Sequence, residues 1–466
     1  MTMKKEHLNE LTESEDVDRR SFIKGASIST LMMMMGGTVL VPRHQAKGAD
    51  AVETPRPTTP PVNCGIIGCG VWGRDIIATL GQLPNAPVTA VCDTYGAYLR
   101  RAARSAPDAK QYENYKDLLA DPNVQAVLVA TPTHLHRQIV EDAIKAGKHV
   151  YCEAPLAHTV EDARAIALAA KKAPKINFQT GLNYRSDPQR HFLVPFIRTG
   201  SWGTTAMARA QYHKKQSWRR TSSSADQEKL INWRLDKETS LGLIGEIGIH
   251  QLDAAGWFMA LRPKSITGFG SIIHWKDGRT VDDTVQAIFE YEGGARLMYD
   301  ATLANSFDAD YEMYYGTDAA LMVRENKAWM FKEVDAPLLG WEVYARKDQF
   351  YKEVGISLVA NATKLTAIID KPQDESPYAS TPLYYSLEAF VSNTFNHQTA
   401  VTDFIDAFGS DDPAALIDYL KEINETKLPA AGFAEAYEAT VLCIKADEAI
   451  RTGRKVEIKD EWFELA

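Results

Sequence analysis

The chain has 466 residues, of which 45% are hydrophobic and 24% charged, and its formal net charge is −9. This composition is that of an ordinary globular protein with two or three domains, and the negative charge argues against nucleic acid or an anionic membrane as a partner. The cysteines show neither a C-x-x-C pair nor metal-ligand spacing, so we expect unpaired thiols packed as small hydrophobes and no metal site. They are Cys64, Cys69, Cys92, Cys152 and Cys443.

Residues 1–49 have the pattern of a targeting signal rather than of a folded domain. A polar, acidic start is followed by Arg19-Arg20-Ser21-Phe22-Ile23-Lys24 and then by a weakly apolar stretch from Ala26 to Val41. Twin arginines before such a stretch resemble a twin-arginine export signal, and the stretch is too short and too interrupted to be a typical membrane-spanning helix. We expect the twin-arginine machinery to export the protein, to the periplasm or beyond. An uncleaved anchor or a simple basic tail is the alternative.

Residues 50–61 are rich in proline and include Thr54-Pro55-Arg56-Pro57 and Pro60-Pro61. Proline holds such a chain near the extended polyproline II conformation. We therefore predict a linker or arm here.

A glycine motif opens the first predicted domain. The apolar run Cys64–Ile67 ends in Gly68-Cys69-Gly70-Val71-Trp72-Gly73, which has the G-x-G-x-x-G spacing. In this motif the first glycine permits a tight turn, the second lets backbone N–H groups approach a pyrophosphate, and the third lets the following helix pack closely. The motif alone is weak, but it predicts a dinucleotide site made by Gly68, Gly70, Val71, Trp72 and Gly73.

The second predicted strand, Val88–Asp93, ends in a carboxylate about 20 residues beyond the last glycine. A carboxylate at this place accepts hydrogen bonds from the ribose hydroxyls of NAD and would repel the 2′-phosphate of NADP. We expect Asp93 to bind the cofactor and NAD to be preferred. Arg100 and Arg101 keep NADP as the less favoured alternative.

Strand-like and helix-like segments then alternate up to about residue 182. The further strands are predicted over 126–130, 149–153 and 176–181, separated by helical patterns of ten to fifteen residues. This order is typical of a doubly wound parallel sheet, an α/β Rossmann domain over residues 62–182, in which ligands bind beyond the carboxyl ends of the strands. The candidates at those ends are Thr131, Pro132, His134, His136 and Glu153.

Past residue 182 the pattern changes to alternating, β-branched and aromatic segments. Strands predicted over 204–213, 264–275, 283–292, 295–303 and 311–315 indicate an α+β domain over residues 183–466 with a largely antiparallel open sheet. A helix is predicted over 243–261 between them. Residues 331–395 are interpreted as an insertion, and helices over 398–408, 413–423 and 433–452 end the chain. The last of these could pack back on the first domain.

His250 is the best catalytic candidate. On one continuous helix, Glu246 lies four residues before it and Asp253 three after it, so all three would share a face. A histidine beside a carboxylate is suited to proton transfer near neutral pH. From spacing alone, a structural histidine satisfied by these neighbours is an equal alternative, and a metal site is a poorer one.

Several of these motifs together resemble the Gfo/Idh/MocA oxidoreductases, which include glucose–fructose oxidoreductase and inositol dehydrogenases. They are the glycine motif, Ala130-Thr131-Pro132 with His136, Glu153-Ala154-Pro155, Trp233-Arg234-Leu235-Asp236 and Gly245–Asp253. The match covers roughly residues 62–325 and 430–460. The resemblance implies a NAD-dependent oxidoreductase acting on a sugar or cyclitol hydroxyl, with His250 as the proton acceptor.

One motif departs from the family pattern. Where typical members have the lysine of a Glu-Lys-Pro motif, this chain has Ala154, and the usual aspartate before the histidine is Glu246. Proton transfer would then depend on His250, helped by Tyr184 or His134. A glycosidase that oxidises and re-reduces its substrate with bound NAD is one alternative function, and a non-catalytic sugar-binding relic is another.

The remaining candidates concern the substrate and the assembly. Guanidinium groups bind oxygens and aromatic faces stack on sugar C–H surfaces, which makes Arg185, Trp233 and Arg234, with Asp253, candidates for binding a polyol. The alternative for each is ordinary packing or a surface ion pair. The family resemblance also implies a homodimer or homotetramer built on the open sheet.

Overall fold

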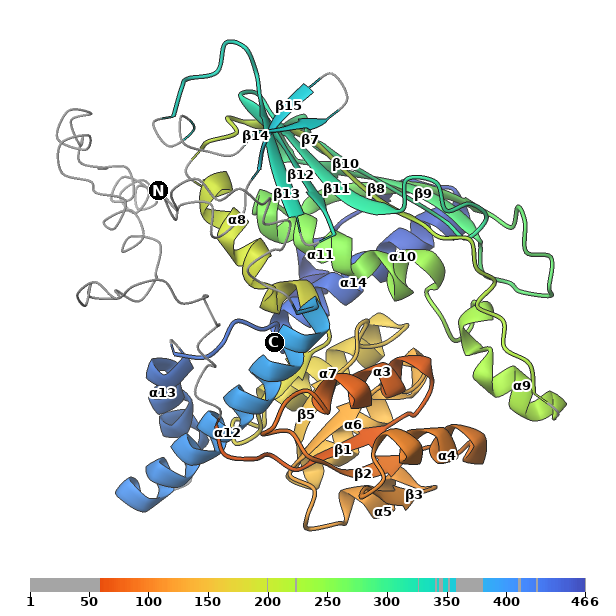
Figure 1. Cartoon of the computed structure of the whole chain (residues 1–466), viewed down its shortest axis with the longest axis vertical. Helices are drawn as coiled ribbons and strands as arrows, with labels where there is room; N and C mark the ends of the chain where they lie inside the picture. Colours follow the sequence, from red (N-terminus) through yellow and green to blue (C-terminus); the bar gives the residue numbers. More distant parts are fainter. Residues whose placement is uncertain are drawn as a thin grey trace, which may run out of the picture. The chain divides into compact units, whose positions relative to one another are not determined.

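A computed structural model gives the fold of this chain (Figure 1). It describes residues 59–465 except 199, 223, 326, 340–341, 343–346, 351–352, 358–379, 410–411 and 425. The export signal expected over 1–49, residues 50–58 of the proline-rich arm expected over 50–61, and part of the expected insertion lie outside the described residues.

The first sheet is parallel and six-stranded, in the order β3-β2-β1-β4-β5-β6. Its strands are β1 (Cys64–Ile67), β2 (Val88–Cys92), β3 (Lys110–Tyr112), β4 (Ala126–Val129), β5 (His149–Cys152) and β6 (Phe178–Thr180). The order reverses between β1 and β4, which places the ligand crevice of a doubly wound sheet beyond the carboxyl ends of these strands. The predicted Rossmann architecture is confirmed.

Helices connect these strands on both faces of the sheet, which is why β1, β4 and β5 are buried along their whole length. They are α3 (Val71–Leu80), α4 (Gly96–Ser105), α5 (Tyr115–Leu119), α6 (His136–Lys145) and α7 (Val160–Lys171). As expected, the five cysteines are all free and buried.

The second sheet has ten strands in the order β14-β15-β13-β12-β11-β7-β10-β9-β8-β16. The predicted strands are β7 (Thr205–His213), β8 (Pro263–Ser271), β9 (Thr284–Tyr291), β10 (Arg296–Thr302) and β11 (Asp310–Gly316). The sequence analysis missed β12 (Ala319–Arg324), β13 (Lys327–Lys332), β14 (Lys347–Phe350), β15 (Glu353–Ser357) and β16 (Val456–Glu457). The sheet is antiparallel except between β7 and β10, which run parallel, so the predicted largely antiparallel sheet is confirmed.

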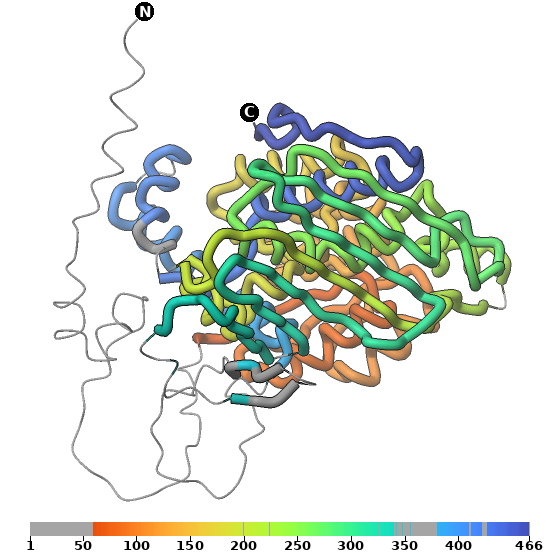
Figure 2. The backbone as a smooth tube through the Cα atoms, turned by 90° about the horizontal axis from the view of Figure 1, so that it is seen from above, coloured from red at the N-terminus to blue at the C-terminus, as the bar shows by residue number. Residues whose placement is uncertain are grey.

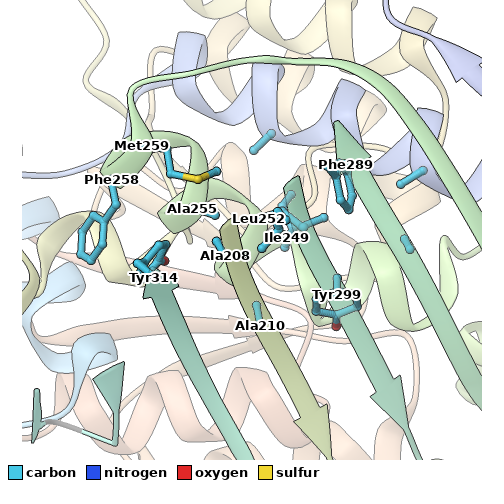
Figure 3. Close-up of a cluster of buried hydrophobic side chains, with 14 of the residues drawn as sticks. Ala208, Ala210, Ile249, Leu252, Ala255, Phe258, Met259, Phe289, Tyr299 and Tyr314 are labelled. Atoms are coloured by element: carbon cyan, nitrogen blue, oxygen red, sulfur yellow. The ribbon is translucent and has the colours of Figure 1, made fainter. Parts of the chain in front are cut away.

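One face of this sheet carries the larger hydrophobic core of the protein. Helices α11 (Gly248–Met259) and α14 (Phe433–Thr452) pack on it. In Figure 3, Ile249, Leu252, Ala255, Phe258 and Met259 of α11 meet strand residues that include Ala208, Tyr299 and Tyr314. Figure 2 shows the sheet from its opposite face. In this view its strands lie in front, and no helix of the described residues is drawn over them.

The C-terminal helices correct the expected domain plan. Helix α12 spans Pro382–Phe408, so it begins inside the stretch interpreted as an insertion. Its Leu383, Leu387, Phe390 and Val391 belong to the core of the Rossmann sheet, because their spacing lines one helix face. α13 (Pro413–Asn424) follows, and α14 packs against both α7 and β8. In the described part of the chain, no helix combines the length and apolarity needed to cross a membrane.

Candidate functional site

The glycine turn after β1 has the geometry that its three glycines predict. Gly68 has φ +98°, and a Cβ there would lie 2.6 Å from the backbone of Ala130. A Cβ on Gly73 would lie 1.9 Å from the Gly68 carbonyl oxygen, so α3 packs on the turn only because this residue has no side chain. Around Gly70, in contrast, a Cβ would meet nothing within 4 Å. The turn is tight behind and open in front of the α3 N-terminus, where Val71 and Trp72 are exposed.

Asp93 lies at the end of β2 and is fixed by this turn. Its carboxylate accepts hydrogen bonds from the backbone N–H of Cys69 and of Tyr95, both at 2.7 Å. Burial raises the Asp93 pKa, while the two N–H donors and the nearby Arg74 oppose the rise. The carboxylate is therefore held against the glycine turn, with its further lone pairs free for ribose hydroxyls.

The turn after β4 carries Thr131, Pro132 and Thr133. The Thr131 Oγ1 is buried and has no hydrogen-bond partner among the described residues, as a ligand-facing hydroxyl would. His136, which the sequence analysis assigned to the cofactor, has another role. Its Nε2 lies 3.0 Å from the Thr131 carbonyl oxygen and its Nδ1 3.1 Å from that of Pro155. The fully buried ring therefore ties two strand-end turns together rather than facing a ligand.

Glu153 directly follows β5, at the carboxyl end of the parallel sheet, and is buried. Burial raises its pKa to about 7, against the opposing effects of a hydrogen bond from the Trp72 side chain and of the Arg234 charge. Its Oε1 has no partner among the described residues. A Cβ on Gly181 would lie 2.3 Å from Glu153 Oε2, so this glycine makes room for the carboxyl. Ala154, which follows, offers no polar group.

The helix predicted over 243–261 is broken in two at Ile247 (φ −125°, ψ −53°). α10 (Gly242–Glu246) carries Glu246, and α11 carries His250 and Asp253. Gly248, the first residue of α11, lets this helix start close to β10, because a Cβ on it would lie 2.9 Å from the Tyr299 ring. The prediction that all three residues lie on one continuous helix is therefore wrong for Glu246, whereas His250 and Asp253 do lie three residues apart on α11.

Both carboxylates have partners far away in the sequence. Glu246 accepts a hydrogen bond from Thr133 Oγ1 at 3.1 Å and one from Ser240 Oγ at 3.2 Å, so it links the second domain to the turn after β4. Asp253 makes a two-pronged ion pair with Arg185, with both N···O distances 2.8 Å. Neither carboxylate bonds to His250, and the expected carboxylate orienter of this histidine is absent from the described contacts.

His250 is instead bordered by an aromatic ring and a buried cation. The Tyr184 ring centroid lies 5.8 Å from that of His250. The Arg190 guanidinium lies over the Tyr184 ring, 3.6 Å from its centroid. Burial, with a smaller contribution from Arg190, lowers the His250 pKa to about 4. Its Nδ1 is buried and has no hydrogen-bond partner in the part of the chain that the structure describes. The imidazole is therefore neutral at pH 7 and has a nitrogen left for a ligand.

Arg190 is itself held by Glu312 of β11, at 2.6 Å and 2.9 Å. The sequence analysis missed this pair and the Thr133 contact, because each joins residues more than a hundred positions apart. A local signal was the spacing of Arg190 with Leu193, Val194 and Ile197, which puts the arginine on the apolar face of α8 (Pro188–Arg198). An arginine buried on such a face requires a buried anion.

Two of the predicted substrate residues, Trp233 and Arg234, form an aromatic and basic wall together with Trp218 and His134. The Arg234 guanidinium lies 5.2 Å from the Trp233 ring centroid and 5.9 Å from that of Trp218, and its Nε lies 4.0 Å from Glu246. His134 packs 6.3 Å from Trp233. Arg185 does not join this wall, since Asp253 holds it and the Trp257 ring lies 4.9 Å from it.

These residues fit a dinucleotide cofactor on three structural observations. The space in front of Gly70 is open, the α3 N-terminus presents its N–H groups there, and Asp93 is held beside them. The unpartnered buried atoms Thr131 Oγ1, Glu153 Oε1 and His250 Nδ1 all belong to the site. No group of three or more potential metal ligands occurs among the described residues.

Two family models match the chain. The model described as "Oxidoreductase family, NAD-binding Rossmann fold" matches residues 62–182, and the one described as "GFO/IDH/MocA C-terminal domain" matches residues 195–321. Together they cover more than half of the chain.

Among curated proteins, the chain is 29% identical to a levoglucosan dehydrogenase of Pseudarthrobacter phenanthrenivorans, over 52% of this chain and 67% of that protein. It is 29% identical to a myo-inositol 2-dehydrogenase of Thermotoga maritima, over 58% and 74%. It is also 26% identical to a glycosyl hydrolase family 109 protein of Shewanella baltica, over 44% and 50%. The matches thus span half to three quarters of these relatives.

Among solved structures, an oxidoreductase domain protein from Kribbella flavida superposes with a TM-score of 0.64 at 21% identity, covering 86% of this chain and all of that one. A levoglucosan dehydrogenase in complex with NADH gives a TM-score of 0.62 at 20% identity, over 85% and 99%. At these identities the likeness concerns the fold.

Proposed function

Because this chain belongs to the Gfo/Idh/MocA family of oxidoreductases and has the NAD-binding Rossmann domain of that family, we propose that it oxidises a hydroxyl group of a sugar or cyclitol. The observation that carries the proposal is the neutral imidazole of His250, which keeps an unpartnered nitrogen in a site that fits NAD. The relatives named dehydrogenases of levoglucosan and myo-inositol support this substrate class.

In the proposed reaction, the C–H bond of the hydroxyl-bearing carbon and the O–H bond both break, and a carbonyl group forms. NAD, when bound, supplies the chemistry that takes up the hydride. His250 accepts the hydroxyl proton, for which it must be neutral, and the Arg190 charge favours that state. Burial raises the pKa of Tyr184 to about 12, so its phenol stays protonated and donates a hydrogen bond rather than competing for the proton.

The buried carboxyl groups orient the site. Glu246 holds the turn after β4 through Thr133, and Glu153 presents a free oxygen beside Trp72. Arg234 and Trp233 offer a cation and an aromatic face to a polyol. Ala154 leaves His250 as the proposed proton acceptor.

The test begins with a mass spectrum of the nucleotide that copurifies with the protein. The protein is then assayed for NADH formation with levoglucosan, myo-inositol and a panel of aldoses. We expect turnover of at least one of these that is lost in His250→Asn. Turnover that survives this substitution unchanged would remove His250 from the mechanism.

A second candidate function is glycoside hydrolysis that uses bound NAD transiently. The match to a glycosyl hydrolase family 109 protein favours it, together with Ala154 in the Glu-x-Pro turn. Release of nitrophenol from nitrophenyl glycosides without net NADH formation would select this function over the dehydrogenase.

We also propose that the protein is exported in the folded state by the twin-arginine machinery, with its NAD already bound. The support is Arg19-Arg20-Ser21-Phe22-Ile23-Lys24 and the apolar stretch after it. Replacing both arginines by lysine should leave the protein in the cytoplasm, as cell fractionation would detect. A variant that is exported as well as the wild type would contradict the proposal.

A homodimer or homotetramer is the proposed assembly. On the second sheet, Ile288 and Met298 are paired neighbours on β9 and β10, and both are exposed, as is Phe269 of β8. Exposed apolar side chains grouped on one sheet face are typical of a protein interface. Light scattering after gel filtration should give two or four subunits, and Ile288→Glu should yield monomers.

A further inference from the structure

A segment of the second domain reaches across to the Rossmann domain. It consists of the loop Ser217–Ser222 and helix α9 (Ala225–Ile231), which we call the α9 strap. In the view of Figure 1, α9 stands away from the ten-stranded sheet and beside α4. At its tip, Ser222 Oγ lies 3.4 Å from the hydroxyl of Tyr95, which is 127 residues away in the sequence.

The strap is braced by polar contacts rather than by a core. The Asn232 side chain accepts a hydrogen bond from the Arg220 N–H and donates one to the Arg220 carbonyl, both at 2.7 Å. Arg219 pairs with Glu228 at 2.6 Å. In contrast, α9 has no buried residue, and Leu230 is 63% exposed. The strap thus has a defined shape, but little apolar area fixes it in place, so its closure is inexpensive to reverse.

The strap meets the Rossmann domain where the dinucleotide site lies. Tyr95 is two residues beyond Asp93 and donates its N–H to that carboxylate at 2.7 Å. The Tyr95 and Tyr98 rings pack edge to face, with centroids 4.9 Å apart. Arg74 lies 5.7 Å from the Tyr98 centroid and donates to the Cys69 carbonyl of the glycine turn at 2.9 Å.

Arg220 brings a positive charge to the same place. Burial raises the Tyr98 pKa, and Arg220 is the first of the charges that oppose this rise, ahead of Arg74. The Arg220 backbone is pinned by Asn232, whereas no hydrogen bond or ion pair is described for its guanidinium. A cation near the Tyr95–Tyr98 pair that follows Asp93 is suited to the phosphates of a dinucleotide.

We propose that the α9 strap closes over the adenosine and phosphate end of the NAD site and slows the release of the cofactor, with Ser222 and Arg220 as its contacting residues. This inference rests on the proposed function only in taking NAD as the ligand. It adds a part of the second domain to the adenosine end of the site, where the residues described above, Asp93 and the glycine turn, belong to the Rossmann domain.

The test measures the rate of NADH release. The full chain loaded with NADH is mixed with excess NAD⁺ in a stopped-flow instrument, and the loss of energy transfer from tryptophan is followed. We expect Arg220→Ala with Ser222→Ala to release NADH about 10-fold faster, the effect of removing a hydrogen bond and one screened charge. The contribution of Arg220 to slowing NADH release should decrease at high salt, because salt screens its charge. Lys229→Ala is the matched control, because it removes an exposed cation of α9 that makes none of these contacts, and it should match the wild type.

A double-mutant cycle tests the contact itself. Tyr95→Phe should speed release as Ser222→Ala does, and the two together should be no worse than either alone, because both remove one hydrogen bond. Hydrogen exchange of residues 217–222 should also slow when NADH is added. If all variants released NADH at the wild-type rate, or if hydrogen exchange of residues 217–222 did not change with NADH, the proposed closure of the α9 strap would be contradicted. The proposed binding of NAD would not be affected. If the wild type bound no NADH, the proposed function itself would fail.

Discussion

The glycine turn and the helix that carries His250 differ in how they are built. In the turn, Gly68, Gly70 and Gly73 lie within six residues, and each does what its place in the motif predicts. At the helix, Glu246 and Asp253 lie four and three residues from His250 in the sequence, but a break at Ile247 separates Glu246 from the histidine and Arg185 holds Asp253. A motif made by the backbone is decided locally, whereas a motif made by charged side chains depends on which partners the fold provides.

The largest expected effect is at the helix. His250→Asn should lower kcat/KM about 1,000-fold, since it removes a general base, with NADH affinity nearly unchanged. In the wild type, kcat/KM should fall as the pH drops through about 4, because the base must be unprotonated. A pH–rate profile of the wild type and of His250→Asn measures the loss of kcat/KM and its pH dependence. An acidic limb near the usual histidine pKa would show that Arg190 and burial do not act on His250 as described.

The glycine turn offers a matched pair of variants. Gly73→Ala should destabilise the protein by ~3 kcal/mol, because the new Cβ would clash with the Gly68 carbonyl oxygen. Gly70→Ala meets no atom within 4 Å and has φ −61°, so it should leave stability unchanged and weaken NADH binding about 10-fold. Urea unfolding and NADH titration separate the two. Equal losses of stability in both variants would contradict the conclusion that a side chain at Gly70 meets open space.

The long-range ion pair should matter more for stability than for the cofactor. Asp253→Asn leaves the Arg185 guanidinium without its anion in a buried site, so the free energy of unfolding should fall by ~3 kcal/mol with unchanged NADH affinity. Lys421→Ala breaks an exposed pair with Asp418 and should cost less than ~1 kcal/mol. If both variants are equally stable, the Arg185 pair is not a structural element.

A pH-dependent effect that is smaller for each side chain than the loss of the Arg185 pair lies away from both regions, where α12 meets β5. The His149 and His397 rings pack 6.2 Å apart beside Lys427. Burial, with the Lys427 charge, lowers their pKa to about 4 and about 3. Unfolding lets each imidazole bind a proton, so stability should fall from pH 7 to 5 by ~1–2 kcal/mol per ring. His397→Gln should reduce this slope in urea unfolding at several pH values, and an unchanged slope would contradict it.

Much of the fold could be predicted from the sequence because its signals are local. Strand and helix alternation, the glycine spacing and Asp93 gave the Rossmann domain and its NAD site, and the alternating segments gave five strands of the second sheet. The sequence did not reveal that α12 begins at Pro382 and completes the Rossmann core, since its apolar face says only that something is buried, not against which sheet.

By itself, the sequence determined many backbone features of this protein: where the chain turns after β1, which segments form the Rossmann strands, and where a dinucleotide is expected to bind. Only the tertiary structure decided the electrostatics around His250. It replaced the expected carboxylates by Tyr184, Arg190 and Glu312, and it moved His136 from the ligand to a link between two turns. The physical reason is that a buried charge or imidazole must be satisfied by whatever partner the folded chain brings near, and that partner has no fixed distance in sequence.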